Sequence, residues 1–129
     1  KHTDWLKYAP CKEIMDKNNI KNTAQLQSWF NTQLENHILS KGKKMIGWDE
    51  ILEGGISKNT AVMIWRGDLA DEHAKIAADH NTNFVMVPSS HLYFDMSQMQ
   101  GELSDNWLKK LLNLEKVYSF ETPESAYNM

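Results

Sequence analysis

The chain has few of the features that would assign it at once to a class of protein. Cys11 is the only cysteine among the 129 residues, so no disulfide can form within the chain. No run of about 18 apolar residues occurs, and the sequence therefore predicts no membrane-spanning segment. Fourteen basic residues stand against 17 acidic ones, and this net charge of −3 argues against nucleic acid or an anionic membrane surface as the partner.

Several kinds of chemical site are also missing from the sequence. No glycine-rich phosphate loop is present, because Gly54-Gly55 reads as the stop of a short helix. The five histidines are scattered without the spacing of metal ligands, so no metal site is predicted. The sequence begins at Lys1 without a charged-then-apolar leader, and we expect its amino end to be processed or cut from something longer.

Three short apolar runs, at 45–48, 62–65 and 84–88, are the main positive signal. An aromatic residue with a carboxylate or an arginine ends or follows each of them. Buried parallel strands read as unbroken apolar runs, and ligand sites in such sheets form just past the carboxyl ends of the strands. Aromatic faces beside hydrogen-bonding groups at that edge predict a binding pocket, and a sugar is its natural ligand.

The remaining elements follow from periodicity and from capping residues. Asn22-Thr23 offers an amino cap, Gly42 a stop, and the residues between them repeat apolar positions at helical spacing (Leu26, Trp29, Phe30, Leu34 and Ile38). We expect strands over 44–48, 61–65 and 83–87, helices over 12–17, 23–41 and 69–78, a short turn of helix at 51–53, and a last helix over about 104–112. Residues 1–22 outside the short helix, 96–104 and the tail from Glu121 are expected to be irregular, with Pro10 breaking any long element.

Strands that alternate with helices indicate an α/β fold with a parallel sheet. Three strands cannot close a barrel, and a complete eight-fold barrel takes roughly 250 residues. The chain is therefore either a small open α/β domain or about half of a barrel. A half-barrel would leave two unpaired strand edges, through which self-association is expected.

Three motifs in register resemble one known family. Gly47-Trp48-Asp49-Glu50-Ile51-Leu52, Ile64-Trp65-Arg66-Gly67, and Pro88 followed by Tyr93-Phe94-Asp95 are similar in order and spacing to the second half of the catalytic barrel of glycoside hydrolase family 20, the β-N-acetylhexosaminidases. The resemblance implies a partial (β/α)8 TIM barrel, about strands five to seven with their helices. Residues 1–129 would form a single fragment of the catalytic domain.

The family's chemistry is what the resemblance implies for function. Its members hydrolyse terminal β-linked N-acetylglucosamine or N-acetylgalactosamine from glycans, with no metal and no organic cofactor. Hydrolysis is substrate-assisted: the sugar's own acetamido oxygen attacks the anomeric carbon, while one carboxylate orients the acetamido N–H and a neighbouring glutamate protonates the leaving oxygen. Members of the family are often secreted or periplasmic, so the resemblance also implies such a location.

One part of the family pattern is absent. The family carries its acid pair in a His-x-Gly-Gly-Asp-Glu motif at the end of the fourth strand, and this chain contains no such motif. By the family pattern we expect that motif just before Lys1 and the eighth strand beyond Met129. The chain is therefore predicted to be inactive by itself.

Four residues are candidates for the sugar site, each weighed against an ordinary structural role. Trp48 and Trp65 resemble the tryptophans that wall the acetamido methyl group, although barrel-core packing would also explain them. Tyr93 resembles the catalytic tyrosine that hydrogen-bonds the acetamido oxygen, rather than only a packed aromatic. Asp95 resembles a residue that binds sugar hydroxyls, although a lone loop aspartate is usually a turn former.

The adjacent carboxylates Asp49 and Glu50 imitate an acid–base pair. Neighbours on a strand point to opposite faces, so we expect structural or rim hydrogen-bonding roles for them, with an outer sugar contact open for one. Arg66 is expected to pair with a nearby carboxylate, and His91 to be a surface histidine. Two alternatives stay open beside the enzyme: a non-catalytic carbohydrate-binding α/β module, and an α/β scaffold whose aromatics are all core.

Overall fold

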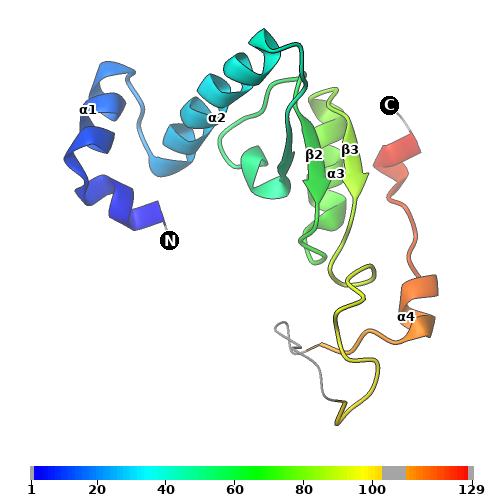
Figure 1. The fold of residues 1–129 in the computed structure, drawn as a ribbon. Coiled ribbons are helices and arrows are strands. Elements are labelled where there is room, and N and C mark those ends of the chain that lie inside the picture. Colours follow the sequence, from blue (N-terminus) through cyan, green and yellow to red (C-terminus); the bar gives the residue numbers. More distant parts are fainter. Residues whose placement is uncertain (1, 103–109, 128–129) are drawn as a thin grey trace.

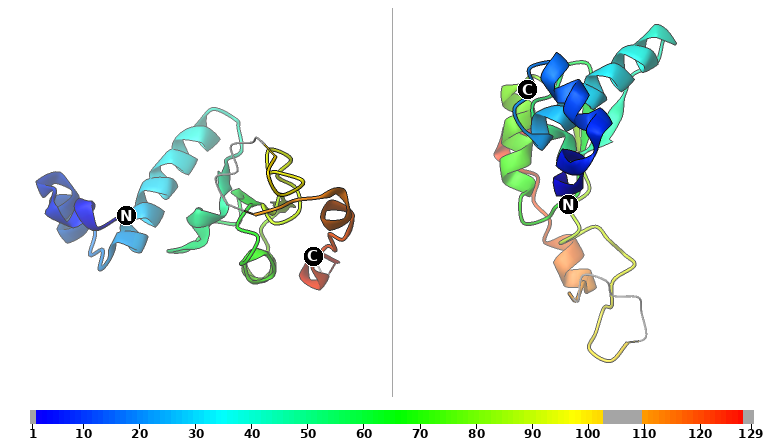
Figure 2. Two further views of the ribbon diagram at one scale, coloured as in Figure 1. Left: turned by 90° about the horizontal axis from the view of Figure 1, so that it is seen from below. Right: turned by 90° about the vertical axis from the view of Figure 1, so that its left-hand side faces the viewer.

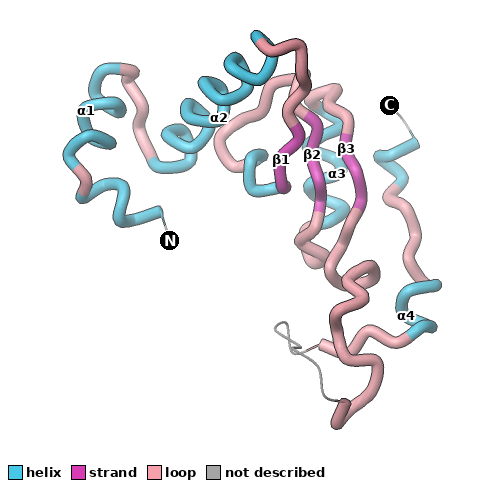
Figure 3. The backbone as a smooth tube through the Cα atoms, viewed as in Figure 1, coloured by secondary structure: helices cyan, strands magenta, loops and turns pink. Residues whose placement is uncertain are grey.

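The structure is a computed structural model that describes residues 2–102 and 110–127. Helices and three short strands alternate along the central part of the chain (Figures 1 and 3). In chain order the elements are η1 (His2–Lys7), α1 (Ala9–Lys17), α2 (Thr23–Ser40), β1 (Ile46–Trp48), η2 (Asp49–Leu52), β2 (Ala61–Ile64), α3 (Ala70–Asp79), β3 (Phe84–Met86), α4 (Leu114–Tyr118) and η3 (Glu124–Tyr127), where η denotes a 3-10 helix.

The strands form one parallel sheet in the order β1-β2-β3, which confirms the predicted α/β fold. The register places Trp48 beside Met63, and Met63 beside Val85, so these three residues form one row across the sheet. Helix α3 lies against one side of the sheet (Figures 1 and 2). All three carboxyl ends meet at one edge, where ligand sites of parallel sheets form.

The sheet buries only one of its two faces. Val62 and Ile64 are fully buried and form the core with Ala70 and Ala74 of α3. On the other face Ile46, Trp48 and Val85 are 53%, 52% and 47% exposed. The expectation of strands buried on both sides is therefore wrong for the chain as described, because α3 and η2 cover one face.

Helix α2 forms as predicted. The Asn22 side chain accepts a hydrogen bond from the Gln25 amide at 2.9 Å, and Gly42 just past the helix has φ +67°, a left-handed conformation that glycine adopts without strain. Its apolar face is buried at Leu26, whereas Phe30 is 59% exposed. Elements η1 and α1 lie beyond α2, away from the sheet (Figure 1).

The two ends of the chain differ from the sequence-based expectation. Residues 2–17 form η1 and α1 with a short break between them. Pro10 does not interrupt α1, because it lies in the first turn of that helix, where its missing N–H costs nothing. The expected helix over 104–112 falls largely outside the described residues. Leu111 and Leu112, which it was to include, are not helical.

A short helix follows that segment instead. Asn113 caps α4 by accepting a hydrogen bond from the Lys116 amide at 2.9 Å, an amino-cap signal that the periodicity argument passed over. The tail expected to be irregular contains the turn η3, which contacts α3. Residues 96–102 contain no helix or strand, as predicted.

Candidate functional site

An open hollow of about 260 Å³ lies at the carboxyl edge of the sheet, and Trp48, Glu50, Trp65 and Tyr93 line it. Trp48 is the last residue of β1, Trp65 directly follows β2, and Tyr93 lies in the loop after β3. The structure thus brings together three of the four predicted site residues. Three successive strand ends deliver one aromatic ring each, which is the arrangement the apolar runs predicted.

Two of the rings stack on each other. The ring centroids of Trp65 and Tyr93 are 6.3 Å apart with an interplanar angle of 21°, within the range of favourable offset stacking. Trp65 and Tyr93 are largely shielded from solvent, whereas Trp48 is 52% exposed. The hollow is therefore lined by a stacked aromatic pair and by a more exposed indole.

Glu50 is the polar member of the hollow. The Trp65 Nε1–H donates to both carboxylate oxygens, with Nε1 3.1 Å from Oε1 and 3.1 Å from Oε2. Sequence reasoning predicted a structural or rim hydrogen-bonding role for Glu50, with an outer sugar contact open for either Asp49 or Glu50. The available signal was its position two residues after Trp48, but the sequence does not say which of the two adjacent carboxylates faces the pocket.

Asp49 points the other way and is fully buried. Its Oδ2 accepts from the backbone amides of Trp65 and Arg66, both at 3.2 Å, and lies 3.0 Å from His73 Nδ1, while Oδ1 accepts from Arg66 Nε at 2.9 Å. This carboxylate joins the ends of β1 and β2 to α3. Burial opposes its ionisation, but the hydrogen bonds from His73 and Arg66 outweigh burial and lower the pKa of Asp49.

The adjacent carboxylates therefore do not form a catalytic pair. They lie in η2 rather than on a strand, so the reason given for their divergence is wrong, although they do diverge. The structural role expected of Arg66 is confirmed, because it binds Asp49 and also Glu53, with Nη1 2.8 Å from Glu53 Oε1. Together these contacts fix the backbone that carries Trp65.

Tyr93 presents its hydroxyl group in a partly desolvated environment. Burial raises the pKa of the Tyr93 phenol, and the negative charges of Asp95, Asp49 and Glu50 raise it further. A phenol is already protonated at neutral pH at its ordinary pKa of about 10, and this environment favours the same state, so the O–H group can donate a hydrogen bond. Asp95 itself is exposed and is not among the residues that line the hollow.

Within residues 2–102 and 110–127, no group of three His, Cys, Asp or Glu side chains is placed to bind an ion. His73 is buried against Asp49, a contact that sequence reasoning missed because nothing in the spacing links the two. His91 is partly buried rather than fully exposed, and its Nδ1 lies 2.8 Å from Ser90 Oγ.

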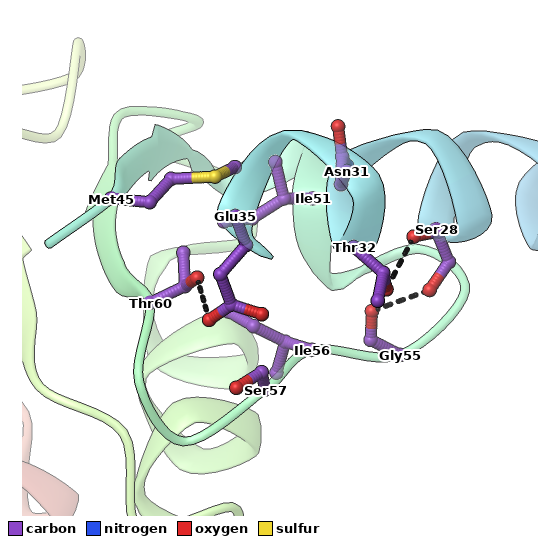
Figure 4. A pocket seen from close by; sticks show the side chains of 10 residues that line it. All are labelled: Ser28, Asn31, Thr32, Glu35, Met45, Ile51, Gly55, Ile56, Ser57 and Thr60. Atoms are coloured by element: carbon purple, nitrogen blue, oxygen red, sulfur yellow. Dashed lines mark hydrogen bonds between the residues drawn. The ribbon is translucent and has the colours of Figure 1, made fainter. Parts of the chain in front are cut away.

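A second cavity lies between α2 and the loop that precedes β2 (Figure 4). The buried Glu35 reaches down from α2 and accepts a hydrogen bond from Thr60 Oγ1 at 2.7 Å, and Ser28 Oγ donates to the Gly55 carbonyl at 3.0 Å. The free space is about 20 Å³, roughly the room that one water needs. The hydrogen bonds around this cavity anchor the loop to α2, and the cavity is too small for a sugar.

In the described part of the chain, no helix combines the length and the apolar character needed to span a bilayer. Cys11 is partly buried and lines an apolar groove of about 210 Å³ with Trp5, Ile14, Leu26, Trp29 and Phe30. This groove lies between the amino-terminal helices and α2, far along the chain from the aromatic hollow.

Comparisons with known proteins cover nearly the whole chain. Residues 1–129 match the family model described as glycosyl hydrolase family 20, catalytic domain. A β-hexosaminidase of Porphyromonas gingivalis is 36% identical over 117 residues, which are 90% of this chain and 15% of that protein. A β-hexosaminidase of Vibrio furnissii is 26% identical over 120 residues, 91% of this chain and 19% of that protein.

Solved structures agree with the sequence relatives. The family 20 exo-β-N-acetylglucosaminidase of Vibrio harveyi, in complex with N-acetylglucosamine, superposes with a TM-score of 0.78 at 31% identity, covering 92% of this chain and 18% of that one. A β-N-acetylhexosaminidase of Bacteroides fragilis shares the fold, with a TM-score of 0.71 at 23% identity, covering 89% of this chain and 24% of that one. The chain spans less than a fifth of the length of the curated relatives named above.

Proposed function

Because the chain belongs to glycosyl hydrolase family 20, within the catalytic domain, we propose that it forms one side of the sugar site of a β-N-acetylhexosaminidase. The observation that carries the proposal is the convergence of Trp48, Trp65 and Tyr93 on one hollow at the carboxyl edge of the sheet. Such an edge is where barrel enzymes place their active sites. We assign the three strands to about strands five to seven of the barrel, as one fragment of the domain covering 1–129.

The indoles of Trp48 and Trp65 are proposed to hold the acetamido group of the substrate. Aromatic faces favour the acetamido methyl group and exclude water from it. Holding that group in one place keeps its carbonyl oxygen next to the anomeric carbon, which turns the attack into a well-oriented intramolecular step. The volume of the hollow, about 260 Å³, approaches the lower end of the range for small-molecule sites, which starts near 300 Å³.

Tyr93 is proposed to donate its hydroxyl hydrogen to the acetamido oxygen. As that oxygen attacks, charge develops on the acetamido group, and a fixed donor stabilises it without reorganising. The position of Tyr93 in the hollow supports this role, because a phenol is protonated throughout the neutral range and its O–H group can donate there. Asp95 is proposed to bind sugar hydroxyls from outside the hollow, close enough for its charge to act on Tyr93.

The protonation of the leaving oxygen is proposed to come from an acid pair that this sequence does not contain. Neither Asp49 nor Glu50 fits that role, since the first is buried in an ion-pair network and the second is bound to the Trp65 indole. We therefore propose that substrate-assisted, retaining hydrolysis needs residues beyond the chain, and that the 129 residues alone bind N-acetylhexosamine glycans without cleaving them.

The test compares hydrolysis with binding on the purified chain. A chromogenic β-N-acetylglucosaminide should show no turnover above background. Tryptophan fluorescence should respond to N-acetylglucosamine but not to glucose, which lacks the acetamido group. Enzyme-like turnover by the chain would contradict its proposed dependence on an external acid pair. An equal response to both sugars would instead favour a general sugar-binding surface.

A further inference from the structure

Glu50 is the one residue of the hollow to which the proposed reaction gives no role. Its carboxylate faces the aromatic rings, yet both of its oxygens accept from the Trp65 indole. We propose that Glu50 is a positioning residue that sets the plane of the Trp65 indole for the acetamido group. This proposal rests on the proposed function of the hollow.

The geometry restrains the indole at two places. Nε1–H is shared between two carboxylate oxygens at 3.1 Å each, and the ring stacks on Tyr93 at 6.3 Å. A tryptophan side chain has two rotatable bonds, so a hydrogen bond at the nitrogen together with a stacked face leaves it one orientation. A hydrogen bond to an ionised acceptor is roughly twice as strong as a neutral one.

Glu50 is itself held by its surroundings. The Gln27 side chain on α2 donates from Nε2 to the Glu50 carbonyl oxygen at 3.0 Å. The preceding Asp49 is fixed by the amides of Trp65 and Arg66. The following Ile51 packs so closely over Gly47 that a Cβ at that glycine would lie 2.9 Å from Ile51 Cδ1. The backbone on both sides of Glu50 is therefore fixed before any ligand arrives.

This arrangement has a consequence for affinity. A pocket whose walls are already oriented does not lose side-chain freedom when it binds a ligand. Removing the carboxylate would leave the indole N–H without its acceptor and free the ring to turn. Binding would then have to order the ring, so affinity should fall although Glu50 need not touch the sugar.

The test uses the full chain and three variants. Glu50→Ala removes the acceptor, Glu50→Gln keeps an acceptor oxygen but removes the charge, and Glu13→Gln removes a charge from the exposed surface of α1, away from the hollow. The indole N–H resonance of Trp65, identified by its loss in Trp65→Phe, reports the hydrogen bond in the absence of sugar. Titration with N-acetylglucosamine gives the affinity.

Glu50→Ala should shift the Trp65 resonance and weaken binding about tenfold, the loss expected for one hydrogen bond to a charged group. Glu50→Gln should restore most of both readouts, and Glu13→Gln should change neither. An unmoved resonance in Glu50→Ala, or unchanged affinity despite a moved resonance, would overturn the proposal. If the unaltered chain does not bind N-acetylglucosamine, the proposed sugar site is wrong, and Glu50 then has no ligand for which to position the ring.

Discussion

At the residue scale, the site depends on how two adjacent carboxylates divide their work. Asp49 is buried and binds the backbone and side chain of Arg66, whereas Glu50 faces the hollow and binds the Trp65 indole. One fixes the chain that carries the tryptophan, and the other touches its ring. The sequence shows only two acids in a row, which in isolation resemble an acid–base pair.

Asp49 should make the fold sensitive to acid. Its pKa is lowered in the folded state, so its contribution is fully present above the unfolded value of about 3.9 and is lost as the pH falls through the lower folded value. Asp49→Asn should cost about 3 kcal/mol of unfolding free energy at pH 7, because Arg66 loses its buried partner. Urea unfolding at pH 7 and pH 3 measures both effects.

The matched control is Asp4→Asn, which removes an exposed aspartate that pairs with the exposed Lys7. It should leave stability unchanged, as is usual for surface pairs. The Asp49 account is wrong if Asp49→Asn retains the full acid dependence of the unaltered chain.

The proposed role of Tyr93 as a hydrogen-bond donor in the transition state can be measured separately from packing. Tyr93→Phe keeps the ring that stacks on Trp65 and removes only the hydroxyl group. In the enzyme with its complete catalytic barrel, kcat should fall by about 10²–10³, the usual cost of losing one donor to a developing charge, while KM changes little. Steady-state kinetics with a chromogenic N-acetylglucosaminide would contradict the role if KM rose and kcat did not fall.

At the scale of elements, periodicity and capping residues predicted those helices and strands that depend on residues close together in the sequence. The Asn22 cap and the central strand–helix alternation were visible in the sequence because their signals lie within a few residues. Pro10 was read as a breaker although it serves in the first turn of α1, since the same residue type can interrupt a helix or begin one. Which faces of the strands are covered depends on distant elements, so the open face of the sheet was not foreseen.

The approach of the β3 loop to the end of β2 depends on a glycine. A Cβ at Gly67 would collide with Ser90, lying 2.6 Å from its Cβ and 2.8 Å from its backbone nitrogen. Gly67→Ala should therefore push this loop away and separate Tyr93 from Trp65. We expect a destabilisation of about 1–3 kcal/mol, as for other overpacked sites, together with weaker sugar binding.

Denaturant unfolding and a fluorescence titration measure the Gly67 effect. Adding Ser90→Gly removes the colliding side chain and should recover part of the loss. A Gly67→Ala chain with unchanged stability and affinity would show that the close approach does not position the hollow.

At the scale of the whole molecule, the sheet has unsatisfied edges and an uncovered face. Strands β1 and β3 each pair on one side only within the described residues, and Ile46, Trp48 and Val85 are exposed on the face away from α3. In the barrel that the family relationship implies, neighbouring strands would cover both edges. The likeness in fold to family 20 structures is shown, whereas the assignment to strands five to seven stays a proposal.

The isolated chain is predicted to self-associate through these edges and this face, because exposed strand edges pair readily with other chains. Sedimentation velocity should show species heavier than the 15.0 kDa monomer as concentration rises. Val85→Lys, which places a charge on the open face, should shift the distribution toward monomer, whereas Leu114→Lys on the exposed α4 should not. A single monomeric species at all concentrations would contradict this prediction.

The most direct test of the sugar site is to map N-acetylglucosamine onto the five indoles of the chain by nuclear magnetic resonance. The indole N–H resonances of Trp48 and Trp65 should shift during the titration, while that of Trp29, in the apolar groove beside α1, should stay in place. Glucose at the same concentrations should move none of them. Shifts at Trp29 with none at Trp48 and Trp65 would contradict the account.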